Sequence, residues 1–300
     1  MKVQKNQHIK YLTVSQTDQL WGLYITTIGS QTIAAHSSYP PRSHPSAYWF
    51  DPGLGRVLHE YILLYITAGG GVIESRHCRP VKIVEGMVLL LFPDEWHTYK
   101  PSGKDGWTEY WVGFNGEYIE RLISNNFFSR ESPFFNIGFN EQLVALFKQG
   151  IETAFFQKAA HQQVLAGITN LLLGLIYYSE KNNSFRDKDI ILQIDKARML
   201  MRESVDDNIN PASIAASLHL SYSWFRRVFK KYTGFSPAQY QMEIKVQKSK
   251  ELLTSTGMTV KEIAFDLNFE SVSYFVTFFK LKTGMSPMEY RNKVKEKLNK

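Results

Sequence analysis

The sequence predicts an α+β protein, with a β-rich N-terminal domain that ends in helices and an all-α C-terminal domain with two helix-turn-helix units. Between residues 21 and 114, short apolar runs alternate with glycine-containing turns, a pattern typical of a sandwich or barrel. Between residues 139 and 178, apolar residues recur every three or four positions, which predicts amphipathic helices. Residues 214–290 contain one helical pattern twice, which indicates an internal repeat.

Composition excludes several classes of protein. With 44% hydrophobic and 21% charged residues, the 300-residue chain has the composition of a folded globular protein rather than of a disordered or collagenous one. Residues 1–12 have no apolar core of the kind found in secretory signals, and the longest apolar stretch, 171–178, is too short to span a membrane. Cys78 is the single cysteine, so no disulfide can form within the chain. We therefore expect a cytoplasmic protein that does not enter a membrane.

Positive charge is concentrated in the second domain. Residues 1–186 contain 16 Lys and Arg against 15 Asp and Glu, whereas residues 187–300 contain 19 against 13. The polar segment 179–188 lies between them, and we interpret it as an exposed linker between domains of residues 1–180 and 187–300. A basic terminal domain suggests a polyanion such as nucleic acid as its partner, although charge alone is equally typical of a soluble basic surface.

The elements of the N-terminal domain follow from its apolar runs and glycines. Residues 61–66 and 87–92 are the clearest buried strands, and the three glycines at 69–71 predict a tight turn. Two helices are expected in 139–178. Their apolar faces consist of Leu143, Leu146 and Phe147, and of Val164, Ile168, Leu171, Leu172, Leu175 and Ile176. The second helix is apolar enough to pack partly on the barrel and partly on the same helix of a second copy.

The repeat is the most specific signal in the sequence. Residues 214–240 (IAASLHLSYSWFRRVFKKYTGFSPAQY) and 263–290 (IAFDLNFESVSYFVTFFKLKTGMSPMEY) agree at a spacing of 49 in their first part and 50 in the rest. Each copy predicts a helix, a short turn and a second helix. Ser221 can cap the second helix of the first copy, and these second helices end at Gly234 and Gly284. A Ser-Pro pair, followed by Gln or Glu, then predicts a capping box. In helix-turn-helix units the second helix enters the major groove of DNA.

The outward faces of the two second helices differ in chemistry. The candidate DNA-binding residues are Ser223, Arg226, Arg227 and Lys230 in the first copy and Val272, Ser273, Val276, Thr277 and Lys280 in the second. Arginine can bond to guanine O6 and N7 together, and lysine can bond to phosphate, so the first helix is a candidate base reader. The second helix is much less basic and suits thymine methyl groups or backbone shape. A solvated basic face is the alternative interpretation of the first helix.

The motif F-K-x-x-x-G-x-S-P-x-x-Y occurs at residues 229–240 and again at 279–290. On this motif, residues 190–291 resemble the DNA-binding domain of AraC/XylS-type bacterial transcription regulators. The resemblance implies seven helices, in which a long helix at about 237–253 joins the two helix-turn-helix units. It also implies promoter DNA as the partner, a homodimer, and contact with RNA polymerase. Thr277 stands where the family usually has arginine, which weakens the contact expected from the second unit.

Residues 86–97 resemble the second half of a cupin motif, in which a glycine is followed by a proline and then by a histidine, here His97. Residues 107–114 continue it in the manner of the effector domains of sugar-responsive AraC relatives, which implies a cupin-like β-barrel. Residues 61–85, where catalytic cupins usually have H-x-H, contain His77 as their one histidine, and a transition metal usually takes three or four protein ligands. We therefore expect no metal, no cofactor and no catalytic residue. The alternative is a cupin-type metalloenzyme, an isomerase or dioxygenase, fused to a DNA-binding domain.

A small-molecule pocket is the preferred interpretation of the first domain. Such sites combine aromatic walls with a few fixed polar groups, and an indole beside a carboxylate and a guanidinium suits a sugar. The candidate ligand-binding residues are Trp21, Arg56, His97, Tyr99, Glu109 and Trp111. The resemblance aligns Tyr99, Glu109 and Trp111 with the pocket of a sugar-sensing relative. The sequence thus predicts a ligand-responsive, sequence-specific DNA-binding transcription regulator. A ligand-independent architectural DNA binder is the remaining alternative.

Overall fold

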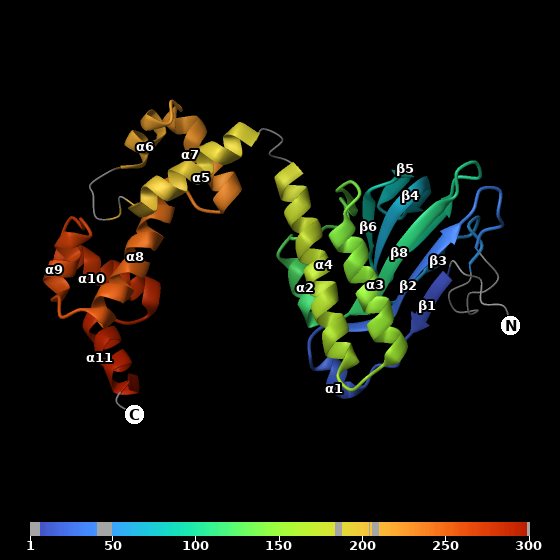
Figure 1. The fold of residues 1–300 in the computed structure, drawn as a ribbon, viewed down its shortest axis with the longest axis horizontal. Helices are drawn as coiled ribbons and strands as arrows, with labels where there is room; N and C mark the ends of the chain where they lie inside the picture. The colour runs from blue at the N-terminus through green and yellow to red at the C-terminus, as the bar shows by residue number, and fades with distance from the viewer. Residues whose placement is uncertain (1–6, 41–49, 184–187, 204, 206–209, 299–300) are drawn as a thin grey trace. The chain divides into compact units, whose positions relative to one another are not determined.

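The computed structural model describes residues 7–40, 50–183, 188–203, 205 and 210–298 (Figure 1). The chain forms two compact units, residues 1–184 and 185–300, which are described separately. The first unit is rich in strands and the second consists of helices, which confirms the predicted α+β class.

The described part of the first unit contains nine strands in two antiparallel sheets that share one strand, β4. The strands are β1 (Gln7–Tyr11), β2 (Tyr24–Ile33), β3 (Arg56–Val57), β4 (Tyr61–Ser75), β5 (Cys78–Val84), β6 (Met87–Leu91), β7 (Trp96–Pro101), β8 (Trp107–Asn115) and β9 (Phe134–Asn136). One sheet has the order β1-β2-β8-β4-β6-β9, and in the other β4 pairs with β5 and with β7, which pairs with β3. An apolar core that contains residues from both sheets fills the space between them.

The glycines at 69–71 lie inside β4, so the predicted tight turn is wrong. Residues 61–69 of β4 pair with β8, and residues 70–75 pair with β5. At this crossing the backbones approach so closely that a Cβ atom on Gly71 would lie 2.1 Å from the carbonyl oxygen of Lys100. The glycines therefore allow one strand to pass from the first sheet into the second, which a sequence pattern cannot distinguish from a turn.

Strand β8 is buried on both sides because helices cover the outer face of its sheet. Trp107, Glu109 and Trp111 point between the sheets, and the alternate residues Val112 and Phe114 point to the outer core. Helices α3 (Glu141–Phe156) and α4 (His161–Asn183) pack on that outer face, as Figure 1 shows. These two helices confirm the prediction for residues 139–178. The short helices α1 (Gln16–Gln19) and α2 (Glu117–Ser124) complete this unit.

The predicted linker at 179–188 is partly helical. Helix α4 continues to Asn183, and α5 begins at Lys188, while residues 184–187 lie outside the described residues. Polar residues are compatible with an exposed final turn, where the Lys181 ammonium lies 4.9 Å from the centre of the Tyr177 ring. A polar composition therefore marked an exposed surface rather than the end of the helix.

The described part of the second unit contains seven helices. They are α5 (Lys188–Glu203), α6 (Pro211–Ser217), α7 (Tyr222–Thr233), α8 (Pro237–Ser255), α9 (Val260–Asp266), α10 (Val272–Thr283) and α11 (Pro287–Leu298). Helices α6 and α7 form the first helix-turn-helix unit, and α9 and α10 form the second. Helix α8 joins the two units and, with 19 residues, is about 28 Å long.

The ends of these helices follow the predicted signals, with one exception. Gly234 and Gly284 adopt φ angles of 82° and 80° at the C-caps of α7 and α10. Ser236 and Ser286 form the predicted capping boxes with Gln239 and Glu289. Ser221 occupies the N-cap position of α7, but its side chain makes no capping hydrogen bond.

Candidate functional site

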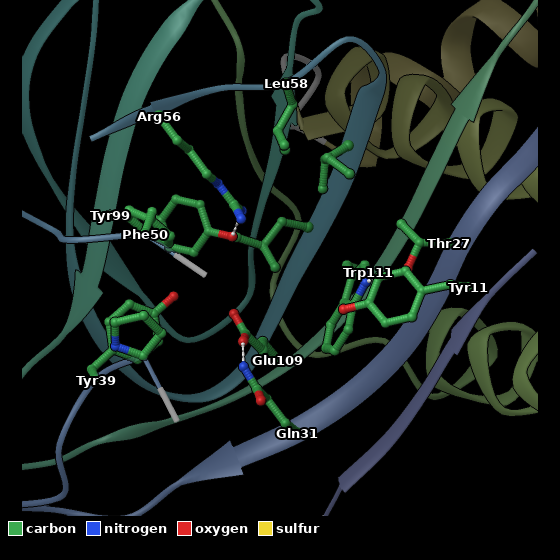
Figure 2. A pocket seen from close by; sticks show the side chains of 13 residues that line it. Tyr11, Thr27, Gln31, Tyr39, Phe50, Arg56, Leu58, Tyr99, Glu109 and Trp111 are labelled. Carbon is green, nitrogen blue, oxygen red and sulfur yellow. Dashed lines mark hydrogen bonds between the residues drawn. The ribbon is translucent and has the colours of Figure 1, made fainter. Parts of the chain in front are cut away.

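A cavity lies between the two sheets of the first unit (Figure 2). Strands of both sheets and the segment before β4 line it, with the side chains of Tyr11, Thr27, Gln31, Tyr39, Pro40, Phe50, Arg56, Leu58, Ile62, Leu64, Tyr99, Glu109 and Trp111. The cavity is small, with a volume of about 40 Å³, and it is partly open to solvent.

Glu109 is the buried carboxyl group of this cavity. Its residue is 3% exposed, and its Oε1 accepts a hydrogen bond from Nε2 of Gln31. Its Oε2 is buried and has no hydrogen-bond partner among the described residues. Burial raises the pKa of Glu109 to about 7, although the hydrogen bond from Gln31 and the charge of Arg56 both lower it. The cavity therefore contains a polar group whose second oxygen can still bond to a ligand.

Arg56 and Tyr99 form the opposite polar wall. Nη2 of Arg56 donates a hydrogen bond of 2.6 Å to the hydroxyl of Tyr99, and the guanidinium carbon lies 4.4 Å from the centre of the Phe50 ring. Burial raises the pKa of Tyr99, so that its hydroxyl stays protonated. Figure 2 shows the ends of Arg56, Tyr99, Tyr39 and Glu109 pointing into the same space. A cation, hydroxyls and a carboxyl thus converge beside aromatic rings.

Trp111 forms an aromatic wall, and its position depends on a small residue on the neighbouring strand. It pairs with Gly29 in the register of β2 and β8, and a Cβ atom on Gly29 would lie 2.5 Å from the indole ring. The indole Nε1 donates to Oγ1 of Thr27 at 3.4 Å. Any larger residue at position 29 would displace the ring that borders the cavity.

The second unit presents two recognition helices of different character. On α7, Phe225 and Phe229 are fully buried, whereas Arg226, Arg227 and Lys230 are exposed. This is the helical periodicity of a buried stripe with a basic opposite face. Ser223 is exposed on the same helix.

On α10 the buried stripe is the same, but the exposed face is nearly neutral. Phe275 and Phe279 are fully buried. Ser273, Thr277 and Lys280 are exposed, and Val272 and Val276 are half-buried against the core of the unit. The nine candidate DNA-binding side chains therefore all lie at least partly at the surface: seven are exposed, and the two valines of α10 are half-buried.

Comparison with known proteins assigns both units. Residues 54–175 match the family of AraC-like ligand-binding domains, and residues 214–293 match a family of helix-turn-helix domains. The chain is an AraC-type transcription regulator. Its first unit is a ligand-binding domain and its second unit is a DNA-binding domain. The alternative of a cupin-type metalloenzyme gains no support from these matches.

Relatives of this AraC-type regulator are other transcription regulators. It is 24% identical to the uncharacterised HTH-type transcriptional regulator YidL of Escherichia coli, over 71% of this chain and 69% of that protein. It is 25% identical to the MmsAB operon regulatory protein of Pseudomonas aeruginosa, over 75% and 73%. It is 27% identical to the arabinose operon regulatory protein of Escherichia coli, over 76% and 78%.

The structure brings together four of the six predicted ligand-binding residues of the regulator. Arg56, Tyr99, Glu109 and Trp111 line the cavity. His97 does not line it: its ring stacks behind Tyr99 at a centroid distance of 6.1 Å, and burial lowers its pKa to about 4. Trp21 is 63% exposed and is absent from the cavity wall, because α1 ends two residues before it, at Gln19, and leaves its ring at the surface.

Sequence reasoning missed several side chains of the cavity, among them Gln31, Tyr39 and Phe50. The alternation of β2, in which Thr27 and Gln31 share a face, was a usable signal. That Gln31 lies opposite Glu109 depends on the register of β2 and β8, which the sequence does not reveal. Among the described residues, no cluster of three or more His, Cys, Asp or Glu side chains could hold a metal ion. No helix there is long and apolar enough to cross a membrane.

Proposed function

We propose that this regulator senses a monosaccharide-sized carbohydrate in the cavity of its first unit, and that the ligand controls binding of the second unit to promoter DNA. The observation that carries the proposal is the convergence of the buried Glu109 oxygen, Arg56 and the Trp111 indole on one cavity. A carboxyl and a guanidinium bond well to hydroxyl groups, and the flat indole suits the C–H face of a sugar ring. We expect this to happen in the cytoplasm, with RNA polymerase as a further partner at the promoter.

The size of the cavity and the names of the relatives support the choice of ligand. A small cavity that is partly open to solvent suits one sugar ring better than an oligosaccharide. Regulators of arabinose, lactose and raffinose operons are among the relatives. For such a ligand to act as a signal, it must bind one state of the regulator more tightly than another, because equal affinity shifts no equilibrium.

The test is thermal unfolding of the full chain with a panel of pentoses, hexoses and disaccharides. A ligand at about 100 times its dissociation constant adds about 2.7 kcal/mol of stability, which shifts the melting temperature by several degrees. We expect one or a few monosaccharides to raise it, with no effect of a chelator. Trp111→Ala should remove the shift, and Trp21→Ala, which truncates the same residue type outside the cavity, should keep it. A shift that survives Trp111→Ala contradicts the proposed site.

We propose further that the regulator is a homodimer through α4. Val164, Leu171 and Tyr178 are 45–65% exposed and recur every seven residues. Gly167 and Gly174 lie between them on the same face, and nothing lies within 4 Å of a Cβ atom placed on either. An apolar seam with seven-residue spacing and small residues suits close packing against the same helix of a second copy.

A further inference from the structure

The two helix-turn-helix units repeat one sequence pattern, but their net charges differ. Residues 211–233, which hold α6 and α7, contain four Lys and Arg and no Asp or Glu. Residues 260–283, which hold α9 and α10, contain three Lys and Arg and three Asp and Glu, a net charge of zero. One of these lysines, Lys282, also forms an ion pair with Glu243 of α8. Phosphate attraction therefore comes mainly from the first unit.

The difference is sharpest at the positions that face outward. The repeat places Val276 of α10 where α7 has Arg226, Thr277 where it has Arg227, and Leu281 where it has Lys231. Arginine reads guanine through O6 and N7, whereas valine and the methyl group of threonine can contact the C5-methyl group of thymine. Val276 packs partly against the core of its unit, so its exposed methyl group is held in one place.

We propose that the operator of this regulator consists of two unlike blocks: α7 reads guanine with Arg226 and Arg227, and α10 reads thymine methyl groups with Val276 and Thr277. This inference rests on the proposed DNA-binding role of the two helices. The blocks are one helical turn of DNA apart, about 10 base pairs from centre to centre. Contacts with the first block supply most of the salt-dependent affinity. In the second block, uncharged side chains discriminate between bases.

The test begins with selection of binding sites from randomised duplexes by the full chain, with and without the sugar panel. Each selected position is then changed by one group. Replacing guanine with 7-deazaguanine removes N7, and replacing thymine with uracil removes the C5-methyl group. We expect 7-deazaguanine to weaken binding about tenfold in one block only. We expect uracil to weaken it about fourfold per methyl group in the other block, the equivalent of about 0.8 kcal/mol.

Variants assign the blocks to the helices. Arg227→Ala should abolish the 7-deazaguanine effect at one guanine, and Thr277→Ser, which keeps the hydroxyl and removes the methyl group, should abolish the uracil effect at one thymine. Thr283→Ser is the matched control on α10, since the Thr283 hydroxyl bonds to backbone carbonyls and its change should leave the uracil effect intact. The inference would be overturned if uracil weakened binding at no thymine, or if 7-deazaguanine weakened binding in both blocks. Failure to select any sequence would instead contradict the proposed DNA-binding role.

Discussion

Among single residues, the candidate site is dominated by a carboxyl group in an apolar core. Glu109 is buried among aromatic and aliphatic side chains with one neutral partner, Gln31, at Oε1. An isolated charge in such surroundings is unfavourable, so the folded protein holds a proton on Glu109 up to a pH of about 7. The protonation state of this one group therefore affects both stability and the hydrogen bonds offered to a ligand.

Replacing Glu109 with Gln should change how stability depends on pH. The pKa of Glu109 rises from its usual 4.5 to about 7 on folding. Its proton therefore stabilises the folded state fully below pH 4.5, and this stabilisation is lost as the pH rises through 7. The free energy of unfolding of the native chain minus that of Glu109→Gln should fall by about 3 kcal/mol between pH 4 and pH 8.

Urea unfolding measures this difference through tryptophan fluorescence, because five of the six tryptophans lie in residues 1–184. His97 titrates in the opposite sense: its pKa falls on folding, so its contribution is present above pH 6.5 and is lost as the pH falls through 4. Because both proteins contain His97, its contribution cancels in the comparison. A difference that stays constant over this pH range would refute a raised pKa at Glu109.

Arg227 is the residue whose loss should be most visible on DNA. Arg227→Ala should weaken binding to the selected operator by about 1–3 kcal/mol if the side chain bonds to a guanine, and should have a smaller effect on random DNA. Titration of the operator and the random duplex at one salt concentration measures the ratio of the two affinities. Arg121→Ala is the control, because it removes an exposed arginine from α2 in the other unit. An equal loss of binding free energy on both duplexes would mean that Arg227 contacts phosphate and does not bond to a base.

At the scale of elements, backbone packing decides where side chains can act. Gly29 on β2 makes room for the Trp111 ring of β8, and the glycines of β4 allow that strand to serve both sheets. The recognition helices show the converse: their buried stripes and C-caps are local, so α7 and α10 share these features and differ in the exposed face and in the N-cap, where Ser271 makes a capping hydrogen bond and Ser221 does not. The repeat therefore preserves the buried faces of α7 and α10 but not their exposed side chains.

The exposed apolar seam of α4 should be essential for self-association. Leu171→Glu places a charge in the centre of the exposed seam and should weaken self-association at least tenfold, because two such charges would face each other in the dimer. Sedimentation equilibrium measures the association constant. Gln149→Glu, which adds the same charge on an exposed position of α3, should leave association unchanged. A dimer of undiminished affinity in Leu171→Glu would place the interface elsewhere.

At the scale of the whole molecule, the two units must be coupled for the regulator to respond to its ligand. The coupling free energy between two binding sites is typically about 1–3 kcal/mol, and each ligand changes the affinity for the other by the same factor. The sugar should therefore change the affinity for operator DNA by about 5- to 150-fold, and saturating operator should change the affinity for the sugar by the same factor. Calorimetric titration of each ligand in the presence of the other measures both. Two tight but independent affinities would mean that the bound sugar is not the effector.

Part of the candidate site was accessible from the sequence. Arg56, Tyr99, Glu109 and Trp111 were predicted together, the last three because a resemblance aligns them with the pocket of a sugar-sensing relative. Trp21 was included for its residue type alone, and only the exposed turn after α1 shows that its ring lies away from the cavity. Gln31 and Tyr39 were missed because their neighbours in space are distant in the chain.

Features that depend on neighbouring residues could be predicted from the sequence: the two-fold repeat, most helix caps, the buried phenylalanine stripes and the uneven charge of the two recognition helices. The passage of β4 through both sheets, the pairing of Gln31 with Glu109 and the shape of the cavity arise from tertiary packing. The two groups of features differ because the interactions that form them differ in range. A cap or a helical stripe is formed by residues within about four positions of one another, whereas strand register and a cavity wall join residues that only folding brings into contact.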